Sequence, residues 1–360
     1  MQSAAADWPW LGDPANAGRM TNAPLRLRLD TQALIHNWRT LDRMSGRAAC
    51  GAAVKADGYG LGAIEVARRL AEAGCRDFFV ATWAEAEVLA PLGLSVSVLH
   101  GVREDDMGVA MTGIARPVLN TPAQIARWRE AEGGPCDVMM DTGINRLGIA
   151  PEDVGVGLLD GLEIETLMSH LACADEDVPM NARQRDAFAT LAGRTSAKRM
   201  SLANSAGIAL GPNYAFDLTR PGLALYGGRQ RSGHDAIRQV VTPEAQVLQR
   251  RRVAAGQTVG YSATWRAEND AEVAILNIGY ADGYFRGFSN RGMASAGDVR
   301  LPVIGRVSMD LVAVLVDAAP AVAESDWLTI DYDLSAASSR SEMSQYELLT
   351  GLGKRFDRYW

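Results

Sequence analysis

Between residues 48 and 228, eight short β-like runs alternate with segments of helical periodicity, and this alternation constrains the fold more than any other feature. Alternating strands and helices predict parallel βαβ units, and eight such units favour a (β/α)8 barrel over a doubly wound open sheet. We therefore predict an α/β fold with a TIM-type barrel over residues 31–232, and the open sheet is the alternative. The runs are AACGAAVK (48–55), RDFFVAT (76–82), SVSVLHG (95–101), ARPVLN (115–120), CDVMMD (136–141), IETLMSH (164–170), RMSLAN (199–204) and GLALYGG (222–228).

After about residue 230 the pattern changes, because β-like runs now follow one another with glycine-rich or acidic turns between them. This pattern predicts a second, mostly β domain over residues 233–360, with a short helix near residue 345. In residues 23–30, three leucines alternate with polar residues as in a half-buried strand, and we expect that strand to join the second domain.

The composition narrows the function classes. The 360-residue chain has a formal net charge of -7 without a long block of one sign, which argues against a nucleic-acid partner. Its four cysteines include no C-x-x-C pair, so we expect neither a metal site nor a disulfide framework. The chain does not open like a secretory leader, and no run approaches the roughly 18 apolar residues of a membrane span. We predict a cytoplasmic protein with no membrane partner, whose residues 1–22 form a flexible extension and whose Met20 is a candidate alternative start.

Polar residues follow several of the predicted strands at one end of the barrel. The loops after the carboxyl ends of barrel strands form the active face of such folds. The residues at this rim are Lys55, Asp141, Arg146, His170, Asn204, Ser205, Arg220 and Gly222. We therefore expect a functional site at this rim.

Three glycine-containing loops on the rim suit a phosphate group. The loops after strands seven and eight often bind phosphate in barrels, and here they offer the Ser205 hydroxyl and a close backbone approach at Gly222. The segment DGYGLG (57–62) adds Tyr59 and precedes a helix, whose N-terminus favours anions. Tight turns alone would explain any one loop, but three loops on one rim favour a phosphate site.

Lys55 ends an apolar strand, where burial lowers the pKa of an ammonium group from about 10.4. A neutral lysine beside a phosphate site can hold a cofactor aldehyde as a Schiff base. The plainer alternative is a lysine that reaches solvent and pairs with Asp57.

Eight motifs, in order, resemble those of the alanine racemases, and the similarity covers nearly the whole chain from about residue 25. They are AVKADGYGLGA, DTGINRLGI, SHLACAD, ANSAGI, RPGLALYG, VGYSATW, IGYADGY and GRVSMD. The resemblance implies a fold-type III pyridoxal 5'-phosphate enzyme with a barrel, a C-terminal β domain, and a homodimer that completes each active site across its interface.

The resemblance also implies residue roles. Lys55 would bind the cofactor and act as the base on one face, and Tyr261 of the partner subunit would be the base on the other. Two bases suit racemisation, because the α proton leaves one face and a proton returns to the other. An ordinary strand aromatic is the alternative for Tyr261. The cofactor would contact Tyr59, Asn204, Ser205 and Gly222 at its phosphate, Arg220 at its pyridine nitrogen, and His170, which would orient Arg220. The substrate would meet Arg146, Tyr280 and Met309, the last two at its entry.

Three positions depart from the family's usual pattern. Met139 stands where many members carry a carbamylated lysine, so Arg146 must be steadied otherwise, for example by a bound anion. Leu61 replaces a histidine, and Lys354 is predicted at the position of a phosphate-binding tyrosine. These departures bear on substrate breadth and cofactor affinity more than on the reaction type.

We predict an alanine racemase that supplies D-alanine for peptidoglycan. The alternatives are a broad-spectrum or serine racemase, a fold-type III decarboxylase, a non-catalytic pyridoxal-phosphate carrier, and a phosphate-binding barrel without a cofactor. The GYSATW and RPG segments favour racemases over decarboxylases, and the carrier consists of a barrel without the β domain.

Overall fold

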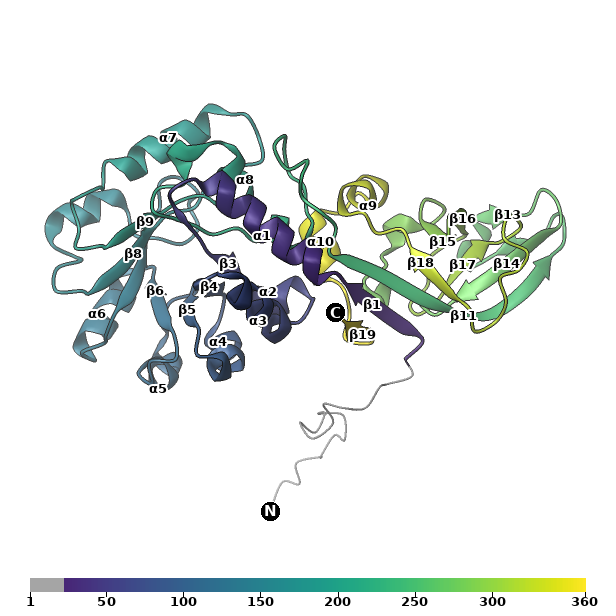
Figure 1. The fold of residues 1–360 in the computed structure, drawn as a ribbon, viewed down its shortest axis with the longest axis horizontal. Helices are drawn as coiled ribbons and strands as arrows, with labels where there is room; N and C mark the ends of the chain where they lie inside the picture. Colours follow the sequence, from purple (N-terminus) through teal and green to yellow (C-terminus); the bar gives the residue numbers. More distant parts are fainter. Residues whose placement is uncertain (1–22) are drawn as a thin grey trace, which may run out of the picture.

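The computed structural model describes residues 23–360, which form two lobes (Figure 1). One lobe is a curled parallel sheet with helices around its outside, and the other consists mainly of antiparallel strands. Within residues 23–360, no helix has the length and apolar character that a membrane crossing requires. The extension predicted at residues 1–22 lies outside the described residues.

The parallel sheet closes into a barrel. Strands β3 to β9 hydrogen-bond in chain order, and β10 pairs in parallel with β2. The N–H groups of Asp217 and Arg220 donate to the carbonyls of Met200 and Ala203, so backbone hydrogen bonds run from β9 through β10 to the first strand. The predicted TIM-type barrel is confirmed, and the open-sheet alternative is wrong. The strands are β2 (Ala49–Cys50), β3 (Ala52–Ala53), β4 (Asp77–Val80), β5 (Ser95–Val98), β6 (Arg116–Leu119), β7 (Cys136–Met139), β8 (Ile164–Met168), β9 (Arg199–Ser201) and β10 (Leu218–Thr219).

The eighth strand is not where the sequence predicted it. It lies at β10, while the predicted run 222–228 begins with a 3-10 helix, η6 (Leu223–Tyr226). The reason is local, because the Ser205 hydroxyl accepts the N–H groups of Gly222 and Ala224, which a strand would present to a neighbouring strand.

Several helices of the barrel lobe begin or end at residues that cap helices. Gly74 ends α3 as predicted, and Thr82 and Glu85 form a capping box at the start of α4. The helices are α1 (Thr31–Ser45), α2 (Lys55–Tyr59), α3 (Ala63–Ala73), α4 (Trp83–Leu89), α5 (Met107–Ala110), α6 (Pro122–Glu130), α7 (Pro179–Ala189) and α8 (Ser205–Ala209).

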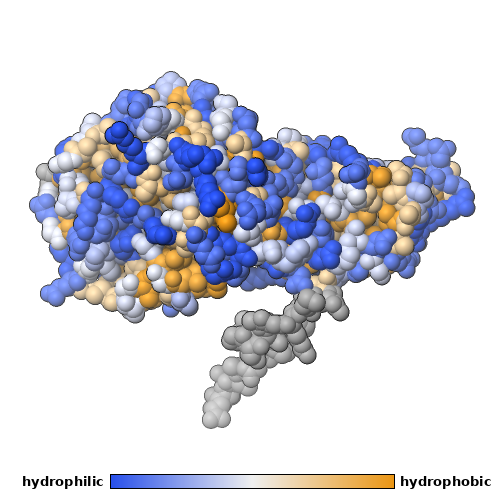
Figure 2. Space-filling model, in the orientation of Figure 1, coloured by the Kyte–Doolittle hydropathy of each residue, from blue (hydrophilic) through white to orange (hydrophobic). Residues whose placement is uncertain are grey.

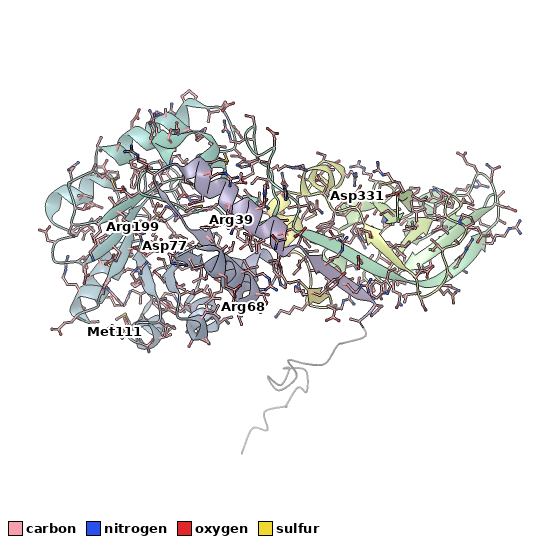
Figure 3. All side chains as sticks on the ribbon, in the orientation of Figure 1. Arg39, Arg68, Asp77, Met111, Arg199 and Asp331 are labelled. Carbon is pink, nitrogen blue, oxygen red and sulfur yellow. The ribbon has the colours of Figure 1, made fainter. Side chains whose placement is uncertain are left out.

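Polar contacts between strands lie toward the amino ends of the barrel strands. Asp77 on β4 and Arg199 on β9 pair at 2.7 Å (Figure 3). Fully buried Asp137 on β7 accepts a hydrogen bond from Ser97 at 2.6 Å.

The strand lobe includes both ends of the described chain. Strand β1 (Leu25–Leu29) pairs antiparallel with β11 and parallel with β19, and its three leucines are buried. Strand β11 also pairs with β14 and β18, so one long strand joins the two parts of this sheet. The other elements are β11 (Val241–Val253), β12 (Thr258–Val259), β13 (Trp265–Arg266), β14 (Ala271–Leu276), β15 (Met293–Ala296), β16 (Val299–Ile304), β17 (Val312–Leu315), β18 (Trp327–Ile330), α9 (Leu334–Ser341), α10 (Gln345–Thr350) and β19 (Asp357–Tyr359).

Candidate active site

A cleft of about 400 Å³ lies at the carboxyl ends of the barrel strands. The rim residues predicted from the sequence are brought together there, with the exception of Asp141. The predicted site residues that line it are Lys55, Tyr59, Arg146, His170, Asn204, Ser205, Arg220 and Gly222. A larger and shallower hollow of about 810 Å³ lies in the strand lobe, but it contains none of these eight residues.

The short segment α2, which begins at Lys55, is a left-handed turn and not a regular α-helix. The four residues after it, Ala56 to Tyr59, all have positive φ values between 52° and 61°. A left-handed conformation costs roughly 1–2 kcal/mol per non-glycine residue, so hydrogen bonds must stabilise this segment. The Ala56 N–H donates to Glu85 at 2.7 Å, and the Ala63 N–H donates to Asp57 at 2.8 Å. Asp57 therefore caps α3, and no ion pair within residues 23–360 joins it to Lys55.

The turn brings Tyr59 to the far end of the cleft. Its ring stacks on Tyr226 with centroids 4.6 Å apart, and its hydroxyl lies against Gly222. A Cβ atom at position 222 would lie 2.2 Å from that hydroxyl oxygen, so only glycine fits there. The start of α3 does not contribute to the lining, contrary to the prediction that this helix start meets the anion.

Ser205 organises the backbone beside Tyr59. Its Oγ accepts the N–H groups of Gly222 at 2.9 Å and Ala224 at 3.1 Å. A hydroxyl with both acceptor positions used still has its own proton to donate, which suits an anionic oxygen. Asn204 caps the short helix α8 through the Gly207 N–H at 2.8 Å, so its role in the structure is to fix Ser205 in place.

Arg220 crosses the buried middle of the site with an exposed fraction of 7%. Its guanidinium donates to Ser201 Oγ at 2.5 Å and to the Ser169 carbonyl at 2.6 Å. Burial lowers the pKa of Arg220 to about 10, so it keeps its proton at neutral pH. Within the described residues, the guanidinium donates its hydrogen bonds to Ser201 and Ser169. A role of His170 in orienting Arg220 stays a prediction. Strand alternation from Arg199 could have identified Ser201 as an inward residue.

Positive charge dominates the electrostatics of the cleft. Burial, together with Arg220, Arg146 and Lys55, lowers the pKa of His170 to about 3, so the imidazole is neutral. Burial, Arg146 and Arg220 lower the pKa of Lys55, and Glu85 opposes them. Lys55 can therefore become a neutral base at a lower pH than an exposed lysine.

Three predicted residues do not reach this cleft within one chain. Tyr261 lies in the 3-10 helix η7 (Tyr261–Ala263) of the strand lobe with an exposed fraction of 69%, so the strand aromatic alternative is wrong. Tyr280 donates its N–H to Ser308, and Ala281 donates to Met309, which places these two loops side by side. Met309 is also exposed.

Two family models match this chain. The alanine racemase N-terminal domain matches residues 29–230, and the alanine racemase C-terminal domain matches residues 240–360. The chain belongs to the alanine racemase family. It is 41% identical over 349 residues to the alanine racemase of Acidiphilium cryptum, covering 92% of this chain and 97% of that protein. It is 43% identical over 347 residues to the alanine racemase of Cereibacter sphaeroides, covering 93% and 98%.

Solved alanine racemase structures have the same architecture. The enzyme from Bartonella henselae, whose crystal structure has covalently bound pyridoxal phosphate, is 33% identical, with a TM-score of 0.85 over 93% of this chain and 99% of that one. The biosynthetic alanine racemase of Pseudomonas aeruginosa is 29% identical, with a TM-score of 0.84 over 94% and 99%.

In this alanine racemase family member, the C-terminal segment also reaches the cleft. Tyr346 on α10 lines it, with its ring centroid 6.3 Å from that of Tyr59. Lys354 is exposed and does not line the cleft, so the expectation for position 354 is wrong. Helix α10, which begins with a capping box of Ser344 and Glu347, is the element that brings a tyrosine to the cleft.

The structure also places Met139 and Leu61, two positions at which the sequence departs from the family's usual pattern. Met139 is buried in the lining, and Arg146 lies exposed at the rim. The carboxylate of Asp141 accepts the backbone N–H groups of Gly143, Asn145 and Arg146. It therefore stabilises the loop backbone, and these bonds do not involve the Arg146 guanidinium. Leu61 is buried below the turn.

Proposed function

We propose that this chain is a pyridoxal 5'-phosphate-dependent alanine racemase that interconverts L-alanine and D-alanine with two bases. The observation that carries the proposal is the cleft, in which a lysine of lowered pKa, a buried arginine and a small polar end lie together in a chain of this family. The Bartonella henselae relative with its covalently bound pyridoxal phosphate supports the choice of cofactor.

The cleft residues fit this cofactor. Tyr59, Ser205 and the backbone at Gly222 form a narrow end that would hold the phosphate, because glycine is required at 222 and the Ser205 proton is free to donate. Arg220 would bind the pyridine nitrogen as a protonated group, and Lys55 would hold the cofactor covalently through Nζ. When bound, pyridoxal phosphate supplies an electron sink that makes the α proton acidic.

The residues of the chain would then move the protons. Lys55, neutral because its pKa is lowered, would take or return a proton at the α carbon on one face. The hydroxyl of the partner subunit's Tyr261 would act on the other face. Arg146 at the rim would bind the substrate carboxylate through two parallel N–H groups.

We propose a homodimer because Tyr261 and Met309 are exposed on the strand lobe and do not line the cleft of their own chain. A second subunit would bring them to a cleft. The partner subunit's Tyr280 and the partner subunit's Met309 would border the substrate entry. Apolar surface on this lobe is visible among hydrophilic residues, and an interface would remove such surface from water (Figure 2).

We further propose domain limits of 31–232 and 233–360, a cytoplasmic location and a role in supplying D-alanine for peptidoglycan. The first matched family model ends at residue 230 and the second begins at residue 240, which supports a domain limit between them. The four cysteines are free thiols, which suits a reducing compartment.

The proposed function predicts that the purified protein with pyridoxal phosphate converts L-alanine into a mixture with about equal amounts of both enantiomers, because they have equal free energy in water. Chiral chromatography of reactions with each L-amino acid measures this and also the substrate breadth. Faster turnover of L-serine would support the serine racemase alternative, whereas release of an amine and carbon dioxide would support the decarboxylase.

The Ser201→Ala variant should loosen the cofactor. Without Oγ, a buried N–H of Arg220 has no acceptor, which costs about 1–3 kcal/mol. We expect faster loss of pyridoxal phosphate on dialysis and an altered absorbance of the bound cofactor, with Ser201→Thr closer to wild type. Ser97→Ala, which removes another buried hydroxyl from the barrel interior, is the control and should change only thermal stability. Unchanged cofactor retention in Ser201→Ala would contradict this role.

A further inference from the structure

Glu85 at the start of α4 binds two segments of the chain at once. Its Oε1 accepts the Ala56 N–H at 2.7 Å, and its Oε2 accepts the N–H groups of Ala81 at 2.6 Å and Thr82 at 3.2 Å. Ala56 directly follows Lys55, whereas Ala81 and Thr82 follow β4. One half-buried carboxylate therefore joins the end of a barrel strand to the turn that presents Lys55.

Another βα unit of the same barrel shows what the helix cap alone requires. Thr121 is the N-cap of helix α6, and Gln124 takes the position that Glu85 has in α4. Gln124 Oε1 accepts the Asn120 N–H at 2.8 Å, and its Nε2 donates to the His100 carbonyl at 3.1 Å. The neutral Gln124 side chain can therefore complete the cap of α6, because the neighbouring loop offers the His100 carbonyl as an acceptor for its NH2 group.

Glu85 differs from Gln124 because its neighbouring loop offers an N–H group. An amide nitrogen facing the Ala56 N–H would place two donors against each other, whereas a carboxylate accepts at both oxygens. Ala56 has a φ of 52°, so its N–H belongs to the left-handed turn that needs stabilisation. The carboxylate at position 85 therefore serves the Lys55 turn in addition to the helix cap.

The surroundings of Lys55 give that charge a second effect. Arg146 approaches from the loop after β7, Arg220 from the segment after β10, and His170 from the end of β8 is neutral. On the lysine turn itself, Asp57 is engaged by the Ala63 N–H. Arg146 and Arg220 lower the pKa of Lys55 beyond the effect of burial, and Glu85 raises it.

We propose that Glu85 is a positioning residue for Lys55, whose carboxylate holds the left-handed turn and supplies negative charge against Arg146 and Arg220. The proposal rests on the proposed function for the identity of the cofactor. It separates into a geometric part, the hydrogen bond to Ala56, and an electrostatic part, the charge.

The test compares Glu85→Gln, Glu85→Asp and Thr82→Ala in the full-length protein with pyridoxal phosphate. Thr82→Ala is the matched control, because Thr82 Oγ1 caps the same helix by accepting the Glu85 N–H at 3.3 Å, while its side chain has no hydrogen bond to the described Lys55 turn. Its effect on thermal stability measures the loss of the cap alone.

For Glu85→Gln we expect the acidic limb of the pH profile of kcat to move down by about one pH unit. In the enzyme–substrate complex the Lys55 amine is free, and without a nearby carboxylate it loses its proton more readily. We also expect loss of pyridoxal phosphate on dialysis to be about tenfold faster, which equals a change of about 1.4 kcal/mol in the barrier. For Glu85→Asp, which keeps the charge but shortens the reach to Ala56, we expect faster cofactor loss with the acidic limb in place.

An acidic limb that stays in place in Glu85→Gln, or moves equally in Thr82→Ala, would overturn the electrostatic part. Cofactor loss at the wild-type rate in both Glu85 variants would overturn the geometric part. The pH dependence of Lys55 labelling by pyridoxal phosphate and borohydride, read by peptide mass spectrometry, tests the same shift without turnover. A failure of alanine racemisation in the wild-type protein would therefore be distinguishable from a failure of this proposal.

Discussion

Lys55→Ala should lower the racemase activity by at least about 10³-fold, because the substitution removes both the covalent attachment of the cofactor and one of the two bases. The effect should be larger than for any other single residue of the cleft, since no other lysine lines it within the described chain. Initial rates from L-alanine and from D-alanine, measured by chiral chromatography, should fall together. The variant should also lose the yellow colour of a lysine-bound cofactor.

Lys354→Ala is the control for this experiment. Lys354 is exposed and lies outside the cleft, so its removal should change neither rate nor colour. In the wild-type protein, borohydride reduction should attach the cofactor to the peptide that contains Lys55. A label on another lysine, or substantial activity in Lys55→Ala, would refute the assignment of Lys55.

Tyr261→Phe should reduce racemisation by about 10²–10³-fold, because the hydroxyl is the group that exchanges a proton on the second face. The two directions should differ at the level of proton abstraction. Deuterium wash-in from solvent should be strongly suppressed with L-alanine and much less with D-alanine, from which Lys55 still removes the α proton. Equal suppression for both enantiomers would count against Tyr261 as a base for one face.

Mixing the two variants tests whether Tyr261 acts in the partner's site. A heterodimer of Lys55→Ala and Tyr261→Phe chains has one site with both the intact lysine and the intact tyrosine. Random reassociation should therefore restore about one quarter of the wild-type activity, although each variant alone is nearly inactive. If Tyr261 served the cleft of its own chain, every site would lack one base and mixing would restore nothing.

The barrel and the assembly of its rim could be predicted because both depend on local patterns. Strand and helix periodicity is a property of short segments, and residues such as Lys55, His170 and Asn204 needed only to follow strands that end at the same rim. The motifs shared with the alanine racemases then assigned roles to residues on both lobes.

The parts that the sequence did not predict depend on contacts between distant segments. The eighth strand ends early because the Ser205 hydroxyl takes the N–H groups of Gly222 and Ala224, and strand propensity contains no information on that contact. Ser201 was missed as a partner of Arg220 for a similar reason, since a serine in a strand is unremarkable until the arginine is placed beside it. The left-handed turn after Lys55 likewise depends on Glu85, which lies 29 positions away.

The connection between the Lys55 turn and β19 also determines when the cofactor site can form during synthesis. Arg358 donates to the carbonyl of Gly60, 298 positions earlier in the chain, and Tyr346 reaches the same cleft from α10. The ribosome therefore completes the whole barrel before the segment that finishes its mouth has been made. Neither contact can form until its C-terminal partner has been synthesised. A nascent chain halted before Tyr346 should hold pyridoxal phosphate poorly, even though its lysine has long since emerged.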